Sequence, residues 1–219
     1  MPPQKPRAAA TRKPSAVMAP RPPRATPTVR GNPSDSGYKM GRFLAPAELI
    51  AGVEEVRSIA ARARIPVLLV GGLAMQHYGS DRLTGDVDFV ARSVPPALAP
   101  IGPLTFGGVQ TETPGGVPVD FIVRDDGYAE LYEEALAVSP KNSQLGVRVV
   151  LPEYLVAMKM VAGRGKDLLD LEFLLQQEGL VDLARARAIV LKHLGRYAAD
   201  EFDRFVDEAA WKKARPQRR

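Results

Sequence analysis

Three aspartates stand where the surrounding sequence predicts buried β-strands. Asp86 and Asp88 belong to the run Asp-Val-Asp-Phe, and Asp120 interrupts the apolar run 117–123. Alternate residues of a strand point to the same face, so Asp86 and Asp88 should be neighbours, with Asp120 about 5 Å away if the two strands pair. Carboxylates this close repel one another unless a cation neutralises them. Oxygen-only ligands suit Mg²⁺ or Mn²⁺, so the pattern predicts a metal site formed by Asp86, Asp88 and Asp120.

The alternative is that these are ordinary surface aspartates at the ends of strands. That interpretation would suffice for an isolated Asp-x-Asp, because such short patterns also occur by chance. Here Asp88 and Asp120 interrupt runs of Val, Ile and Phe, which favours the metal site. Gly71-Gly72 follows the apolar run 65–70, and exposed amides at such a turn favour phosphate. A plain strand-to-helix turn is the alternative for two glycines. The sequence excludes a Walker loop and a dinucleotide fingerprint, because neither a Gly-Lys-Ser/Thr nor a third glycine at the right spacing follows.

The predicted strands and helices that position these residues do not alternate in a regular βαβ order. This order predicts an α+β fold in which a small mixed sheet with flanking helices precedes a C-terminal helical bundle. Strands are predicted at 65–70, 86–91, 104–113, 117–123 and 147–151, with Pro114-Gly115-Gly116 turning a hairpin. Helices are predicted around 49–59 and at 73–78, 128–137, 152–161, 166–177, 181–194 and 196–214. A short helix is also expected within the proline-rich segment 93–103. The predicted parts are a tail (1–40), a core (41–151) and a helical region (152–219).

Composition limits the class of protein. The chain has 219 residues, which suits one domain with a small extension, and 45% hydrophobic residues can build a core. The absence of cysteine excludes disulfides and thiolate metal sites and fits a cytoplasmic location. No apolar run reaches about 18 residues, so no membrane span is expected. Residues 1–40 carry nine prolines and a charge of +7 against −2 for the remainder, which predicts a disordered tail. That tail is either a solvated leader or a loose contact for RNA or DNA.

The order and spacing of these motifs resemble those of a known family of proteins. Gly-Gly, thirteen further residues, Asp-Val-Asp-Phe and a distant aspartate resemble the nucleotidyltransferase superfamily that includes DNA polymerase beta. The run Arg82-Leu-Thr-Gly-Asp-Val-Asp88 looks like bacterial toxin nucleotidyltransferases of the AbiEii type. The stretch 151–159, with Arg164, Lys166, Asp167 and Asp170, is similar to the helical segment of that group. The likeness extends over about residues 68–175.

The resemblance implies a mechanism. Two Mg²⁺ ions about 4 Å apart would be held by Asp86 and Asp88, with Asp120 as a further ligand or as the proton acceptor. An NTP would be the substrate, a nucleoside monophosphate would move to a hydroxyl group, and pyrophosphate would leave. Lys159 is then expected as a further catalytic residue that reaches the triphosphate as a point charge. Roles in nucleotide binding are expected for Gly71, Gly72, Arg82, Thr84, Arg164 and Lys166, and Arg82 and Thr84 could also orient the loop that holds Asp86.

Several alternatives stay open. Lys159 could instead hold its amine in water, Asp167 could cap a helix, and Asp170 could pair with a basic neighbour. The acceptor could be a tRNA 3′ end, a protein side chain or a small molecule such as an aminoglycoside. The resemblance favours the first two acceptors and implies a cognate antitoxin as partner. The competing class is a catalytically silent nucleotide-binding or protein-interaction module, against which the intact set of three aspartates counts. Which NTP is used stays open.

Overall fold

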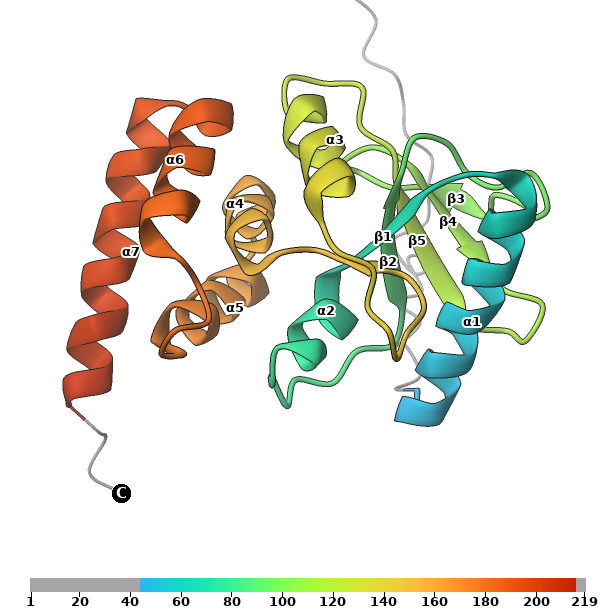
Figure 1. Ribbon diagram of the computed structural model, residues 1–219, viewed down its shortest axis with the longest axis horizontal. Helices are drawn as coiled ribbons and strands as arrows, with labels where there is room; N and C mark the ends of the chain where they lie inside the picture. The colour runs from blue at the N-terminus through green and yellow to red at the C-terminus, as the bar shows by residue number, and fades with distance from the viewer. Residues whose placement is uncertain (1–43, 216–219) are drawn as a thin grey trace, which may run out of the picture. The chain divides into compact units, whose positions relative to one another are not determined.

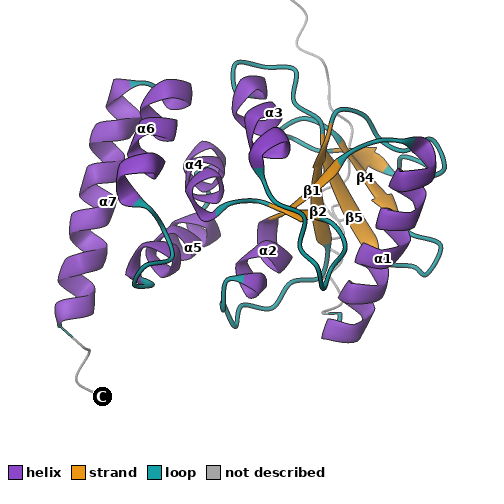
Figure 2. Cartoon of the chain, viewed as in Figure 1, coloured by secondary structure: helices purple, strands orange, loops and turns teal. Residues whose placement is uncertain are grey.

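The computed structural model describes residues 44–215, which contain both helices and the strands of a sheet (Figure 1). The tail predicted at residues 1–40 lies outside this range, as do residues 41–43 and 216–219. The strands gather in one mixed sheet, and the helices flank it or follow it in the chain (Figure 2). None of the helices between residues 44 and 215 is long and apolar enough to cross a membrane.

The order of elements follows the predicted one. The first part contains α1 (Pro46–Ala63), β1 (Val67–Val70), α2 (Gly71–His77), β2 (Val87–Ala91), β3 (Gly102–Pro103), β4 (Val109–Glu112), β5 (Pro118–Ile122), α3 (Ala129–Val138) and β6 (Arg148–Val149). The second part contains α4 (Pro152–Ala162), α5 (Gly165–Gln176), α6 (Leu183–Leu194) and α7 (Arg196–Ala214). The strand order in the sheet is β3-β4-β5-β2-β1-β6.

Strand β2 lies between β5 and β1 in the middle of this sheet. It runs parallel to β5, where Asp88 pairs with Asp120, and antiparallel to β1, where Asp88 pairs with Val70. Strands β4 and β5 form the predicted hairpin, with Glu112 opposite Pro118. Because Gly71 directly follows Val70, the glycine turn and both aspartate strands meet at one place on the sheet.

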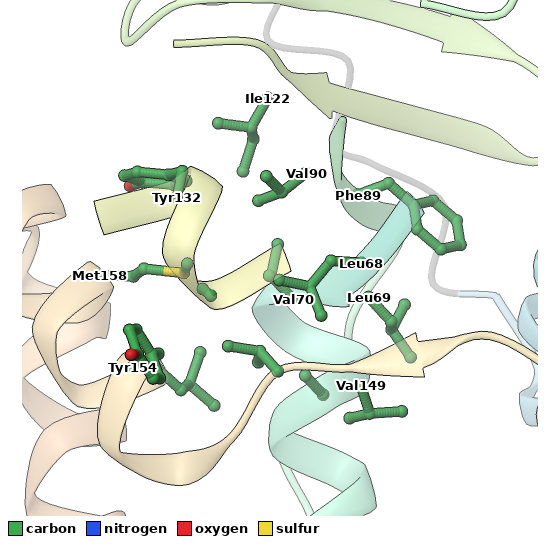
Figure 3. Close-up of a cluster of buried hydrophobic side chains, with 14 of the residues drawn as sticks. Leu68, Leu69, Val70, Phe89, Val90, Ile122, Tyr132, Val149, Tyr154 and Met158 are labelled. Carbon is green, nitrogen blue, oxygen red and sulfur yellow. The ribbon is translucent and has the colours of Figure 1, made fainter. Parts of the chain in front are cut away.

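The two faces of the sheet are covered by different helices. Leu68, Val90 and Ile122 point toward the side on which Tyr132 of α3 and Met158 of α4 lie (Figure 3). Leu69 and Phe89 point the other way, toward the side of α1 (Figure 3). Since side chains alternate along a strand, Asp88 and Asp120 share the face of Val90 and Ile122. The aspartates therefore face α3 and α4, not α1.

The four C-terminal helices begin and end within two residues of their predicted limits. Pro152 stands in the first turn of α4, and Gly163 ends that helix in the left-handed conformation at φ +59°. All residues of α4 from Pro152 to Lys159 are buried. This burial follows from the position of α4, which packs against α3, α5 and α6.

The short helix expected within residues 93–103 is wrong. This segment consists of turns and bends that lead into β3. Pro95, Pro96 and Pro100 supply no backbone N–H, and each disfavours helical geometry in the residue before it. The predicted strand 104–113 is also shorter than expected, because only Val109–Glu112 pairs with β5.

Candidate active site

The parallel pairing of β2 with β5 brings the three predicted aspartates together. Asp86 and Asp88 approach Asp120 so closely that one ligand oxygen from each lies within 4.8 Å of the other two. Asp88 is half-buried, and Asp120 is 9% exposed. The arrangement is an oxygen-only donor set on one face of the sheet.

The electrostatics of these carboxylates favour a bound cation. Burial raises the pKa of Asp88 to about 7, and the nearby Asp86 and Asp120 contribute to that rise. Burial and Asp86 also raise the pKa of Asp120. Carboxyl groups that resist ionisation in a shared site are stabilised as anions when a cation binds among them. Both the oxygen donors and the raised pKa values of Asp88 and Asp120 therefore fit a divalent metal such as Mg²⁺.

Two neighbouring side chains orient these carboxylates. The buried Thr84 hydroxyl donates to Asp86 Oδ1 at 2.8 Å, which agrees with the expected orienting role of Thr84. Gln110 Nε2 donates to Asp120 Oδ1 at 3.3 Å from the neighbouring strand β4. Gln110 was not predicted, although its position opposite Asp120 in the hairpin was the signal that could have revealed it.

Gly71 and Gly72 make room for Asp88. Gly71 has φ +63°, and a Cβ on it would stand 1.8 Å from Asp88 Oδ2. The Gly72 amide donates to the same oxygen at 3.3 Å, and a Cβ on Gly72 would lie 2.5 Å from Thr84 Oγ1. The glycines are thus needed for the close packing of Asp88 and Thr84, and their contact with phosphate stays a prediction.

Lys159 is not solvated, so the alternative that its amine lies in water is wrong. Its side chain is 6% exposed, and its amine lies 3.1 Å from Asp167 Oδ1 and 2.5 Å from Asp170 Oδ2. Asp167 also accepts from the Arg164 amide at 3.3 Å, as expected of a helix cap, and pairs with the Arg164 side chain at 2.6 Å. Arg82 Nε lies 3.0 Å from Asp170 Oδ1. These pairs connect the loop before β2 to α4 and α5.

A cavity of about 280 Å³ adjoins Asp88. Gly71, Asp88 and Lys159 lie at its border, and Ile122 of β5 forms part of its wall. The remaining wall is largely apolar and aromatic, with contributions from α4 and from Phe106, Tyr128 and Tyr132. Arg124 and Arg164 also line it. Among these, Phe106, Arg124, Tyr128 and Tyr132 were not predicted, because no motif distinguishes them in the sequence.

The remaining candidates lie at the margin of the site. Lys166 is exposed and does not line the cavity, but its charge, like that of Arg164, lowers the pKa of Asp120 and so opposes the effect of burial. The structure thus brings together Asp86, Asp88, Asp120, Thr84, the two glycines and Lys159, with Arg82, Arg164 and Lys166 around them.

Comparisons with known proteins give low similarities. No family model matches the chain, and no curated protein matches it. The fold is similar to that of the antibiotic-resistance factor ANT(2″)-Ia, with 14% identity and TM-score 0.45 over 71% of this chain and 96% of that one. It is also similar to an antigenic nucleotidyltransferase-like protein from Paracoccidioides brasiliensis, with 16% identity, TM-score 0.44, and coverage of 75% and 94%.

A third similar structure is a candidate nucleotidyltransferase from H. pylori, with 14% identity, TM-score 0.42, and coverage of 80% of this chain and 100% of that chain. Since identity and TM-score are low in all three cases, the geometry of the site alone carries the functional proposal that follows.

Proposed function

We propose that this protein is a metal-dependent nucleotidyltransferase that moves a nucleoside monophosphate from an NTP to a hydroxyl group. One observation carries the proposal: oxygens of Asp86, Asp88 and Asp120 lie within 4.8 Å of one another beside a cavity of about 280 Å³. Structural aspartates have no need for such proximity, because their mutual repulsion destabilises the fold. A triphosphate substrate explains both the acidic cluster and the adjoining space.

The three aspartates would hold Mg²⁺ or Mn²⁺. The bound metal would neutralise the triphosphate and lower the pKa of the attacking hydroxyl. Asp120 would be a further ligand of the metal or would accept the proton of that hydroxyl. Thr84 would keep Asp86 in the orientation that its 2.8 Å hydrogen bond defines.

In the transfer itself, the acceptor oxygen forms a bond with the α-phosphorus. The bond from that phosphorus to the bridging oxygen breaks, and pyrophosphate carries the electron pair away. Arg164 and Lys166, whose charges reach Asp120, would attract the triphosphate. Lys159 would contact the triphosphate from the border of the cavity, where Asp167 and Asp170 hold its amine and share its charge. Gly71 and Gly72 would lie against the distal phosphates.

The acceptor and the physiological role are narrower proposals. A tRNA 3′ end or a protein side chain is the proposed acceptor, and a toxin with a cognate antitoxin is the proposed role. Both are supported by the sequence motifs that resemble AbiEii-type toxins. Growth arrest on expression, relieved by the product of the neighbouring gene, is the expected result of the corresponding cellular test.

Transfer can be measured with α-³²P-labelled NTPs, Mg²⁺ and either total RNA or cell lysate. Label in RNA or in protein is expected for the wild type, and its position identifies the acceptor class. Asp86→Ala and Asp88→Ala should abolish the transfer without unfolding the protein, whereas Asp200→Ala, at an exposed position of α7, is the matched control. Transfer that persists in both site variants would refute the site. Nucleotide binding without any label transfer would instead identify the silent module.

A further inference from the structure

Arg124 lines the same cavity as Asp88 but lies outside the proposed chemistry. It follows β5, four residues beyond Asp120. Four residues of extended chain span about 13 Å, which is comparable with the length of a nucleoside monophosphate. A nucleotide whose α-phosphate lies at the aspartates can therefore place its base near Arg124.

The guanidinium of Arg124 is held in a fixed position. Its Nε and Nη2 donate to the two carboxylate oxygens of Asp126 at 3.0 and 2.5 Å, and its Nη1 donates to the carbonyl oxygen of Phe106 at 2.7 Å. The rings of Tyr128 and Tyr132 lie 5.4 and 5.2 Å from its Cζ. The side chain is only 6% exposed. Such a group is preorganised and cannot turn away from a ligand in the cavity.

The three hydrogen bonds leave part of this group unused. A guanidinium carries five N–H donors, so one N–H on Nη1 and one on Nη2 have no acceptor among residues 44–215. Buried donors without partners destabilise a protein. A ligand in the cavity that offers acceptors to these two donors would remove that deficit.

The acceptor that fits is neutral. Asp126 already balances the charge of Arg124, and this pairing lowers the pKa of Asp126. The remaining attraction for a second anion is therefore weak. The cavity walls near Arg124 are aromatic or aliphatic, with Tyr132 and Ile122 among them. A planar, uncharged ring with a carbonyl oxygen matches both the walls and the two donors.

We infer that Arg124 reads the base of the NTP and selects bases that carry a carbonyl oxygen. Guanine, cytosine and uracil have such an oxygen, whereas adenine has none and presents an amino donor where guanine presents O6. The inference rests on the proposed function, since it assigns the cavity to the nucleoside of the same substrate. Discrimination of about 10- to 100-fold against adenine is expected, as for other contacts between arginine and a base.

Binding of α,β-methylene triphosphates tests this selection without transfer, because their Pα–C bond is not cleaved. Isothermal titration in Mg²⁺ should show the adenosine analogue binding at least about 10-fold more weakly than the guanosine, cytidine and uridine analogues. The inosine analogue is the sharpest probe, since inosine replaces the adenine amino group with a carbonyl oxygen. It should bind like the guanosine analogue.

Arg124→Lys keeps a positive charge beside Asp126 but loses the planar fork, so it should reduce the differences among the analogues to about threefold or less. Arg187→Lys makes the same replacement at an arginine of α6 whose Nε donates to both carboxylate oxygens of Asp203 on α7, far from the proposed base site, and it should keep the wild-type selectivity. An adenosine analogue that binds as tightly as the inosine analogue would overturn the inference even if Arg124→Lys failed to fold. So would a lysine variant with unchanged selectivity.

The two proposals fail separately. Transfer that runs best with ATP would refute the role of Arg124 and leave the nucleotidyltransferase proposal intact. Base-selective binding without transfer to any acceptor would refute the transferase activity and leave the role of Arg124 intact.

Discussion

Asp88 extends into space that exists only because residue 71 has no side chain. Its Oδ2 lies 1.8 Å from the point where a Cβ on Gly71 would stand. Gly71→Ala should therefore displace the Asp88 carboxylate, and a displacement of about 1 Å can lower a catalytic rate about 100-fold. The strained backbone at φ +63° should also lower the free energy of unfolding by about 1–3 kcal/mol.

Gly179→Ala is the matched control for this change. Gly179 has φ +71°, but no atom of a neighbouring segment lies within 4 Å of the point that an added Cβ would occupy. Because the backbone strain is of the same kind, Gly179→Ala should also lower the free energy of unfolding measured by urea denaturation. It should cause little loss of transfer activity. Equal transfer losses in the two variants would contradict the proposed contact between Gly71 and Asp88.

The raised pKa of Asp88 predicts a pH-dependent effect of metal on stability. Its pKa is about 7 in the fold against 3.8 for the free side chain, so its contribution is fully present below about pH 4 and is lost as pH rises through 7. A pKa change of this size is worth at most about 4 kcal/mol. Since Mg²⁺ favours the ionised carboxylate, it should raise the Tm more at about pH 8 than at about pH 5.

Thermal unfolding in EDTA and in Mg²⁺ across this pH range measures the effect. Asp88→Asn cannot ionise, so it should flatten the pH dependence in EDTA between about pH 5 and pH 8. An equal rise in Tm at both pH values, or an asparagine variant that keeps the wild-type pH dependence, would show that Asp88 is not the group responsible.

Thr84 should affect metal affinity through Asp86. Thr84→Val keeps the shape of the buried side chain but removes the 2.8 Å hydrogen bond to Asp86 Oδ1. Loss of such an orienting group typically weakens metal binding about 10- to 100-fold. Titration with Mn²⁺, followed by its paramagnetic resonance signal, measures this affinity. Thr84→Ser, which restores the hydroxyl, should recover most of it, and a serine variant as weak as the valine variant would point to packing instead.

Lys159 should be far more important for stability than an exposed lysine with similar partners. Lys159→Met leaves Asp167 and Asp170 buried with fewer counter-charges, which should cost about 3–5 kcal/mol. Lys212→Met breaks a pair with Glu172 whose side chains are 37% and 32% exposed, and it should cost about 0–1 kcal/mol. Urea denaturation compares the two, and similar losses would contradict the difference in burial.

The order of the helices could be predicted because single residues mark their ends. Gly163, Gly179 and Gly195 all have positive φ, at +59°, +71° and +87°, and each follows a helical run. The convergence of Asp88 and Asp120 was also predictable, since it needs only the alternation of side chains and the pairing of two strands.

Other features depend on contacts between distant segments. The environment of Lys159 could not be predicted from the sequence. Helix α4 is buried on all sides, so its sequence pattern does not indicate which of its side chains lie next to charged residues. Arg124 is fixed by the Phe106 carbonyl and by two tyrosines that follow it in the chain. Because every residue has a backbone carbonyl, the sequence does not indicate which carbonyl will accept a hydrogen bond from Arg124. This part of the cavity was therefore not predicted.

The parallel register of β2 and β5 also determines which changes in chain length the protein tolerates. Asp88 and Asp120 face the same side only while Val87 stays opposite Val119 and Phe89 opposite Phe121. Deleting Val119 while Pro118 keeps its place would turn the acid toward α1 and bring Phe121 to its place. Extra residues in the irregular segment 92–101 leave this alignment untouched. Length variation among natural variants should therefore accumulate in that segment and be absent from β5.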